Sequence, residues 1–192
     1  MCIRDRKEAG LRWLTGTGTL LSAALFDIER PGAYTNSANT FVADGRQRYR
    51  GVELSAQGQL TRQLAWLLSA QTLDAAFRDI DAQYNGKMPE NTAKHTASAF
   101  LSYDIAAVPG LSVNGGAYYT GKRPIDDLNQ GFIDGYTILA AGARYVTQLF
   151  GKRTLWQLNI DNLGDKRYWS AAGTRLAVGV PRTIKATVKV DL

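Results

Sequence analysis

The sequence predicts an all-β protein, built as part of an antiparallel up-and-down transmembrane β-barrel. Three observations favour this fold class. Hydrophobic and polar residues alternate with a period of two through roughly nine segments, these segments run for about ten residues, longer than is usual in soluble sheets, and the connections between them alternate between short and long. The composition agrees, because 45% hydrophobic and 10% aromatic residues exclude a disordered chain.

The expected strands follow one another with small or medium apolar residues on one face and polar residues on the other. In the segment Thr154–Asp161, for example, Trp156, Leu158 and Ile160 share one face. Strands are expected near Glu8–Leu14, where the pattern is weak, and then at Leu20–Glu29, Arg48–Gly58, Gln63–Thr72, Thr96–Ile105, Leu111–Thr120, Thr137–Thr147, Thr154–Asp161 and Arg182–Leu192.

The connections between these strands take two forms. Short turns are expected near residues 16–18, 61–62, 108–110 and 151–152, and long polar loops at Pro31–Gly45, Arg78–Ala93, Lys122–Asp134 and Gly164–Pro181. Short turns at one end and long loops at the other are the layout of outer-membrane barrels, and Tyr and Trp near the strand ends match an aromatic girdle. A soluble β-sandwich that acts as a binding module stays open as an alternative at this point.

The composition excludes several other classes of protein. The longest charge-free stretch, residues 105–121, is interrupted by Pro109 and by the run Asn114–Gly116, so no helical membrane span is expected. The single cysteine, Cys2, excludes an internal disulfide framework and a cysteine-based zinc site. The net charge of +6 would permit nucleic-acid binding, but the basic residues are scattered over turns and strand ends, so no nucleic-acid partner is expected.

The two ends of the chain differ in pattern. Residues 1–6 fit no strand and contain no signal peptide, so we set them apart as an uncertain, non-native or truncated end and assign residues 7–192 to one barrel portion. The segment Arg182–Leu192, in contrast, alternates without interruption to its last residue. Its apolar face carries Val188, Val190 and Leu192.

Several motifs occur in a characteristic order. Asn159–Tyr168 reads N-I-D-N-L-G-D-K-R-Y, and Gly179–Thr183 reads G-V-P-R-T, with Met88–Asn91 and Tyr118–Arg123 upstream. Together these segments resemble the C-terminal portion of TonB-dependent outer-membrane receptors, in particular the ferric-siderophore branch. The first motif is similar to that family's N-L-F-D-K-x-Y box, with Gly164 in place of the usual aromatic residue, and the second to its G-x-P-R-T entry into the last strand.

The resemblance implies a fold and a function. The fold would be roughly the last nine strands of a 22-stranded barrel, with the plug domain absent. The function would be active uptake of a ferric siderophore across the outer membrane of a Gram-negative bacterium, energised by the TonB–ExbB–ExbD motor through the plug. Iron would enter only as part of the ligand, and no cofactor and no enzymatic activity are expected. Another plugged receptor, for cobalamin or a glycan, and a passive porin stay open as alternatives.

The resemblance also implies partners for the wall of the barrel. The outward face would contact outer-membrane lipid, and the last strand would be read by the barrel assembly machinery. The residues expected to form this assembly signal are Tyr168, Val188, Val190 and Leu192, with Leu192 in place of the commoner terminal aromatic residue.

Two sets of residues are candidates for binding. Polar side chains expected to face the lumen or the plug are Glu53, Arg144, Gln157, Asn159 and Asp161. Aromatic side chains in or beside the long loops, which could stack against a siderophore at the rim, are Tyr34, Tyr84, Phe132, Tyr168 and Trp169. For the aromatic set, loop packing and girdle anchoring are the alternative.

Neither a catalytic nor a metal site is expected. His95 and Ser98 would point to opposite faces of one strand, so they cannot form a hydrolase pair with Asp104. The loop residues Asp126, Asp127, Asn129 and Asp134 suggest calcium, but Leu128 stands where an EF-hand needs a ligand.

Overall fold

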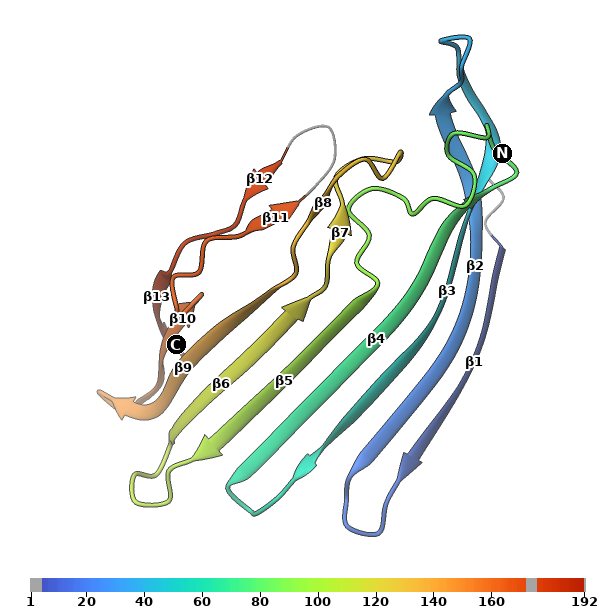
Figure 1. Cartoon of the computed structure of the whole chain (residues 1–192). Coiled ribbons are helices and arrows are strands. Elements are labelled where there is room, and N and C mark those ends of the chain that lie inside the picture. The colour runs from blue at the N-terminus through green and yellow to red at the C-terminus, as the bar shows by residue number, and fades with distance from the viewer. Residues whose placement is uncertain (1–4, 172–175, 192) are drawn as a thin grey trace.

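One curved antiparallel sheet of nine strands dominates the fold (Figure 1). The computed structural model describes residues 5–171 and 176–191. The strands lie in the order β1-β2-β3-β4-β5-β6-β9-β10-β13. Their bounds are β1 Asp5–Leu14, β2 Leu20–Thr35, β3 Phe41–Gln59, β4 Leu64–Arg78, β5 His95–Asp104, β6 Leu111–Thr120, β9 Tyr136–Leu149, β10 Lys152–Asp161 and β13 Thr183–Val190.

Two small hairpins lie within the connections at one end of this sheet. The first pairs β7 (Arg123–Pro124) with β8 (Phe132–Ile133), and the second pairs β11 (Trp169–Ala171) with β12 (Ala177–Val178). Within residues 5–171 and 176–191, no helix is long and apolar enough to cross a membrane.

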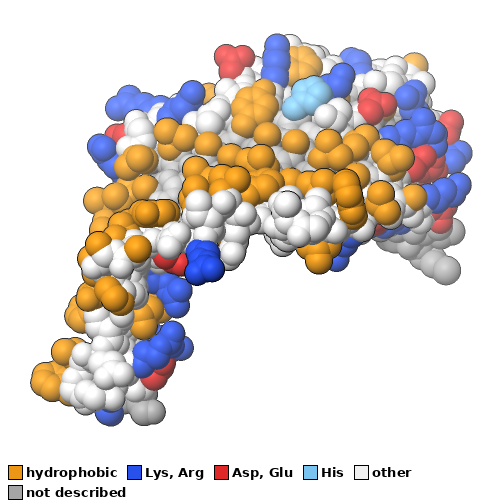
Figure 2. Space-filling model, turned by 90° about the horizontal axis from the view of Figure 1, so that it is seen from below, with side chains coloured by type: hydrophobic (Ala, Val, Ile, Leu, Met, Phe, Trp, Pro, Cys, Tyr) orange, Lys and Arg blue, Asp and Glu red, His pale blue; other side chains and the backbone are white. Residues whose placement is uncertain are grey.

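The register places apolar residues of neighbouring strands side by side. Trp156 of β10 lies opposite Tyr145 of β9 and opposite Val188 of β13, and Leu54 of β3 lies opposite Ala23 of β2. Because residues directly opposite each other share a face, one apolar face extends over all nine strands, as the alternation predicts. Figure 2 shows the hydrophobic side chains as a band between regions where charged side chains gather.

The sheet is a single layer with almost no core. The hydrophobic side chains that are buried in the described residues are Ala75, Ala76, Phe77 and Ile133, whereas Leu54 is 52% exposed on the apolar face. A soluble sandwich would bury that face against a second sheet. The exposed apolar band instead suits contact with lipid, and the sandwich alternative is wrong.

The short turns lie where the sequence predicts them, and the first three show a local cause. In the first, the Thr15 hydroxyl accepts the backbone N–H of Thr19 at 3.0 Å. In the second, the Thr61 hydroxyl accepts the N–H of Leu64 at 3.0 Å. In the third, Gly110 has a φ of +86°, and a Cβ there would lie 2.3 Å from the Val146 carbonyl oxygen, so a larger residue would disrupt the contact with β9.

Two expectations need correction. The predicted loop Pro31–Gly45 is mostly strand, because β2 continues to Thr35 and β3 begins at Phe41. The wall here rises beyond the apolar band, and its apolar face becomes charged: Arg48 pairs with Asp27 at 2.6 Å. In addition, Asp5 and Arg6, which fit no strand in the sequence, pair with Glu29 and Ile28 of β2.

Candidate functional site

Three long connections and one short tip lie at the same end of the sheet and are joined to one another by hydrogen bonds (Figure 1). They are the β2–β3 tip (residues 36–40), the β4–β5 loop (79–94), the β6–β9 loop (121–135) and the β10–β13 loop (162–182). We call this set the loop belt. It contains four of the five predicted rim aromatics, and the fifth, Tyr34, lies on β2 beside it.

The β2–β3 tip is held to the β4–β5 loop through Asp81. The Asp81 carboxylate accepts the backbone N–H groups of Ser37 at 3.1 Å and Gln83 at 3.2 Å, and these bonds, the one from Gln83 above all, hold the pKa of Asp81 below its ordinary value. The Asp81 N–H donates to the Tyr34 hydroxyl at 3.3 Å. Tyr34 and Tyr84 pack edge to face, with ring centroids 5.5 Å apart.

The β4–β5 and β6–β9 loops are joined by a series of side chain to backbone bonds. The Asn129 side chain accepts the Met88 N–H at 2.9 Å and donates to the Met88 carbonyl at 2.7 Å. The Asp127 carboxylate accepts the Glu90 N–H at 2.7 Å, and Lys87 Nζ donates to the Leu128 carbonyl at 2.7 Å. These bonds occupy two of the residues that suggested calcium.

Burial and nearby charge act on Glu90 in this contact. Desolvation raises the pKa of Glu90, and the carboxylates of Asp127 and Asp126 raise it further. In the described residues, no group of three or more His, Cys, Asp or Glu side chains could hold a metal ion. The carboxylates of Asp126 and Asp127 accept backbone N–H groups of Gln130 and Glu90.

Arg123 connects the β6–β9 loop to both of its neighbours. Its side chain is 4% exposed. Nη1 donates to Asn91 Oδ1 and to the Ser170 carbonyl, both at 2.9 Å, and Nη2 donates to the Trp169 carbonyl at 2.7 Å. The guanidinium carbon also lies 5.4 Å from the ring centroid of Tyr136.

The β10–β13 loop forms a cleft with cationic and aromatic walls. Its cavity of about 570 Å³ is lined by Asp165, Lys166, Arg167, Tyr168, Trp169, Val178, Gly179 and Pro181. Tyr168 packs against Tyr136, with ring centroids 4.2 Å apart. A Cβ at Gly179 would lie 2.2 Å from the Tyr168 ring, so this ring lies directly against the backbone.

The predicted rim aromatics fall into three groups in the structure. Tyr34 and Tyr84 pack against each other, which favours a packing role for that pair. Phe132 lies 4.9 Å from the Lys122 ammonium. Tyr168 and Trp169 line the cleft.

The N-L-G-D-K segment is a turn held by two side chains. Asn162, which is 3% exposed, donates to the carbonyls of Lys166 at 2.9 Å and Val180 at 3.0 Å and accepts the Lys166 N–H at 2.8 Å. Asp165 accepts the Arg182 N–H at 2.9 Å. The turn therefore fixes the start of β13 next to the cleft.

The predicted lumen residues lie on the polar face but do not form one cluster. Glu53 accepts a bond from Gln71 at 2.9 Å, Gln157 donates to Asn159 at 3.4 Å, and Asp161 pairs with Lys185 at 2.7 Å. Arg144 lies opposite Gln157 in the register.

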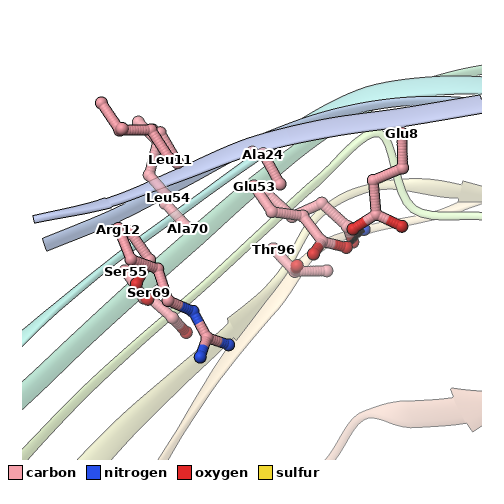
Figure 3. A pocket seen from close by; sticks show the side chains of 14 residues that line it. Glu8, Leu11, Arg12, Ala24, Glu53, Leu54, Ser55, Ser69, Ala70 and Thr96 are labelled. Carbon is pink, nitrogen blue, oxygen red and sulfur yellow. Dashed lines mark hydrogen bonds between the residues drawn. The ribbon is translucent and has the colours of Figure 1, made fainter.

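Glu53 borders a hollow on the polar face (Figure 3). The cavity has a volume of about 760 Å³, and Glu8, Arg12, Ser55 and Ser69 also line it. In Figure 3 these polar side chains extend to the side toward which the sheet curves, whereas Leu11 extends to the opposite side. The polar face is therefore the inner face of the curved wall.

The remaining expectations concern His95 and the last strand. His95 lies 3.3 Å from Thr72 and Ser98 lies 2.8 Å from Ser69, on opposite faces of β5. Val188 lies on the apolar face opposite Trp156, and Val190 lies opposite Thr154. Leu192 lies outside the described residues.

Sequence reasoning missed Arg123, Asn91 and Asp81 as the residues that join the loops. Arg123 and Asn91 lie within motifs that the sequence singled out, which is the one signal that pointed to them. The burial of Arg123 and the bond between Arg123 and Asn91 depend on segments 32 residues apart in the chain, and no periodicity reports such contacts.

Comparison with known proteins identifies relatives of this chain. The sequence profile described as "TonB dependent receptor-like, beta-barrel" matches residues 5–163. The chain is 32% identical to the ferrichrome receptor FcuA of Yersinia enterocolitica, over 91% of the chain and 23% of that receptor. It is 29% identical to the ferrioxamine B receptor of Salmonella typhimurium, over 87% of the chain and 25% of that receptor.

A solved structure gives the same picture. The crystal structure of BauA, the ferric preacinetobactin receptor of Acinetobacter baumannii, superposes with a TM-score of 0.86 at 29% identity. The match covers 98% of this chain and 29% of that receptor. This chain thus spans about a quarter of the length of the curated relatives named above.

Proposed function

This chain belongs to the TonB-dependent receptor-like β-barrel family, and from that premise we propose that it forms part of an outer-membrane receptor for TonB-energised uptake of a ferric siderophore. The observation that carries the proposal is the match to receptors named for ferrichrome and ferrioxamine B over about nine tenths of the chain. The apolar outer face and the loop belt supply the physical requirements: a wall that contacts lipid and a surface that captures a ligand.

Different surfaces of this part of the receptor suit different contacts. The exposed apolar face suits contact with the acyl chains of the outer membrane of a Gram-negative bacterium. The polar inner face, with Glu53, Arg144 and Asp161, suits contact with a plug or with water in the lumen. The ligand would contact the cleft beside Tyr168 and Trp169.

The partners of the whole receptor are part of the same proposal. The TonB–ExbB–ExbD motor would act through a plug outside this chain, and the barrel assembly machinery would read β13, including Val188 and Val190. Iron would be cargo within the siderophore, with no resident cofactor, and the receptor would transport its ligand without chemical change, so it would not be an enzyme.

Uptake in cells tests the proposal. A strain that lacks the full-length gene is complemented with it, in the presence and in the absence of TonB, and radioactive iron is supplied as ferrichrome or as ferrioxamine B. We expect uptake that needs both the gene and TonB. Uptake without TonB would favour a passive porin, and TonB-dependent uptake of cobalamin or a glycan without any ferric siderophore would favour another plugged receptor.

A further inference from the structure

We propose that Arg123 is a positioning residue that locks the β4–β5, β6–β9 and β10–β13 loops into one body. With the three loops locked together, the cleft between Lys166 and Val178 would already have its binding geometry before a ligand binds. The identity of that ligand rests on the proposed function, but the locking is a property of these loops alone.

The first support is the set of hydrogen bonds that Arg123 makes. One bond reaches Asn91 in the β4–β5 loop, and two reach the carbonyls of Trp169 and Ser170 in the β10–β13 loop. Among the described residues, the Arg123 side chain hydrogen-bonds to both neighbouring loops. Its removal would take away these bonds between the β6–β9 loop and its two neighbours.

The second support is the charge of a buried guanidinium. Arg123 is 4% exposed. The oxygens of Asn91, Trp169 and Ser170 that it binds are neutral, and Nε has no partner within the described part of the chain. Taking a cation out of water is costly, and an apolar side chain would fill the space at lower cost. What an apolar residue lacks is the planar fork of donors that holds several oxygens in fixed directions, which points to a geometric role.

The third support is that Arg123 reaches both aromatic walls of the cleft. It binds Trp169 through the backbone carbonyl, while the Trp169 side chain stays 44% exposed. It stacks on Tyr136, which in turn packs against Tyr168 at 4.2 Å. The Tyr168 ring and the backbone that carries Trp169 are therefore held in place before a ligand arrives, and a preorganised site loses less entropy on binding.

The fourth support lies on the other side of Arg123. The later part of the β4–β5 loop is joined to the β6–β9 loop by the bonds of Lys87, Met88 and Glu90 described above, and the Asn91 N–H donates to the Pro124 carbonyl at 3.0 Å. Arg123 thus connects the β10–β13 loop, which forms the cleft, to two loops that are already joined to each other.

A distance measurement in the full-length receptor tests the locking without any ligand. Cys2 is replaced by Ser, and spin labels are attached at Gln83 and Val178, which are both exposed. In the parent receptor we expect a narrow distribution of label distances. Arg123→Met should broaden it, and Arg62→Met, which changes an exposed arginine in a short turn, should leave it narrow. A distribution as narrow in Arg123→Met as in the parent would overturn the proposal.

Two further variants guard against a folding defect. Asn91→Ala removes a partner of Arg123 while the charge stays in place, and it should also broaden the distribution. Arg123→Lys keeps the charge but loses the fork of donors, so we expect a width between those of the parent and of Arg123→Met. Full recovery in Arg123→Lys would show that charge alone is sufficient and would overturn the geometric role.

Ligand binding completes the test, with ferrichrome and ferrioxamine B as probes. We expect Arg123→Met to weaken binding on the order of tenfold, and Arg62→Met to leave it unchanged. Broader distances with unchanged affinity would overturn the positioning role. If the parent receptor binds neither probe nor any other ferric siderophore, the proposed function fails, while the label distances still decide whether Arg123 locks the loops.

Discussion

Leu158 of β10 lies directly opposite Ala186 of β13, whereas Gln157, one residue earlier, lies opposite Thr187. Consecutive side chains therefore leave the sheet on opposite faces. Leu158 is 43% exposed on the apolar face, and Gln157 bonds to Asn159 on the polar face. The two faces meet different surroundings in a membrane wall, and a charge should be tolerated on one and not on the other.

The face assignment leads to the first prediction. A cation at mid-bilayer costs about 2–4 kcal/mol on the lipid face and little in the lumen. Leu101→Arg and Leu158→Arg in the full-length receptor should therefore impair folding, and Ser102→Arg and Gln157→Arg should not. Heat-modifiability on gels measures the folded fraction. Equal behaviour of all four variants would contradict the assignment.

The strands could be predicted because their alternation is local, and the loops could not because their contacts are not. The strand Leu111–Thr120 has the predicted bounds, since each of its residues meets either lipid or the inner face. Where the wall rises above the apolar band, both faces meet water, and the period of two is lost. For this reason the alternation predicts a loop from Pro31, where β2 in fact continues to Thr35.

The sequence predicts which loops carry the candidate site, but not how the side chains in those loops pack. Aromatic residues in long loops pointed to Tyr168 and Trp169, and these do line the cleft. Tyr34 and Tyr84 met the same criterion but pack against each other. Whether an aromatic side chain lines the cleft or packs against another ring depends on contacts such as those of Asp81 and Arg123. The partners of these two residues come from other loops.

The second prediction concerns the turn before β13. Asn162→Ala would leave the Lys166 N–H and two carbonyl groups without their partner in a buried place, and a lost buried bond costs about 1–3 kcal/mol. We expect a loss of that size in the free energy of unfolding, together with faster amide exchange at Lys166. Asn159→Ala removes one longer bond, at 3.4 Å, and serves as the control, with an expected change below about 0.5 kcal/mol.

The third prediction concerns pH at Glu90. The folded-state pKa of Glu90 is raised, so its ionisation opposes the contact between the β4–β5 and β6–β9 loops above that pKa, and protonation relieves the opposition as pH falls through it. Protection of the Glu90 amide from exchange should therefore rise on mild acidification.

A substitution and a second site provide the controls for this pH effect. Glu90→Gln should remove the dependence. At Ser37 the opposite sign is expected, because the lowered pKa of Asp81 stabilises the contact above the ordinary carboxyl range and this contribution is lost as pH falls through the folded-state value. Protection of the Glu90 amide that falls on mild acidification would contradict the assignment at Glu90.

The fourth prediction concerns the independence of the loops. Replacement of residues 122–134 by a short Gly-Ser turn should weaken ligand binding and leave barrel assembly intact. Because Arg123, Asp127 and Asn129 lie within the replaced segment, the β4–β5 and β10–β13 loops should also loosen, which amide exchange at Met88 and Trp169 would measure. Replacement of residues 37–39 removes the Ser37 contact alone and should leave Trp169 protected.

The last prediction concerns the two edges of the sheet. Within the described residues, β1 pairs with β2 alone and β13 with β10 alone. In lipid, each unsatisfied backbone group costs several kcal/mol, so an open sheet cannot span a bilayer. Closing these two edges on each other with nine strands would require a parallel seam, which is rare in such barrels.

We therefore expect the 192-residue chain, expressed alone with an export signal, to aggregate or to be degraded. Co-expression with the remaining strands of the receptor should pair both edges and yield a heat-modifiable barrel. The same co-expression with Val188→Pro, which removes an N–H donor from the middle of β13, should fail. Protease-resistant, ion-conducting monomers of the chain alone in planar bilayers would contradict the argument, because they would require β1 and β13 to satisfy each other.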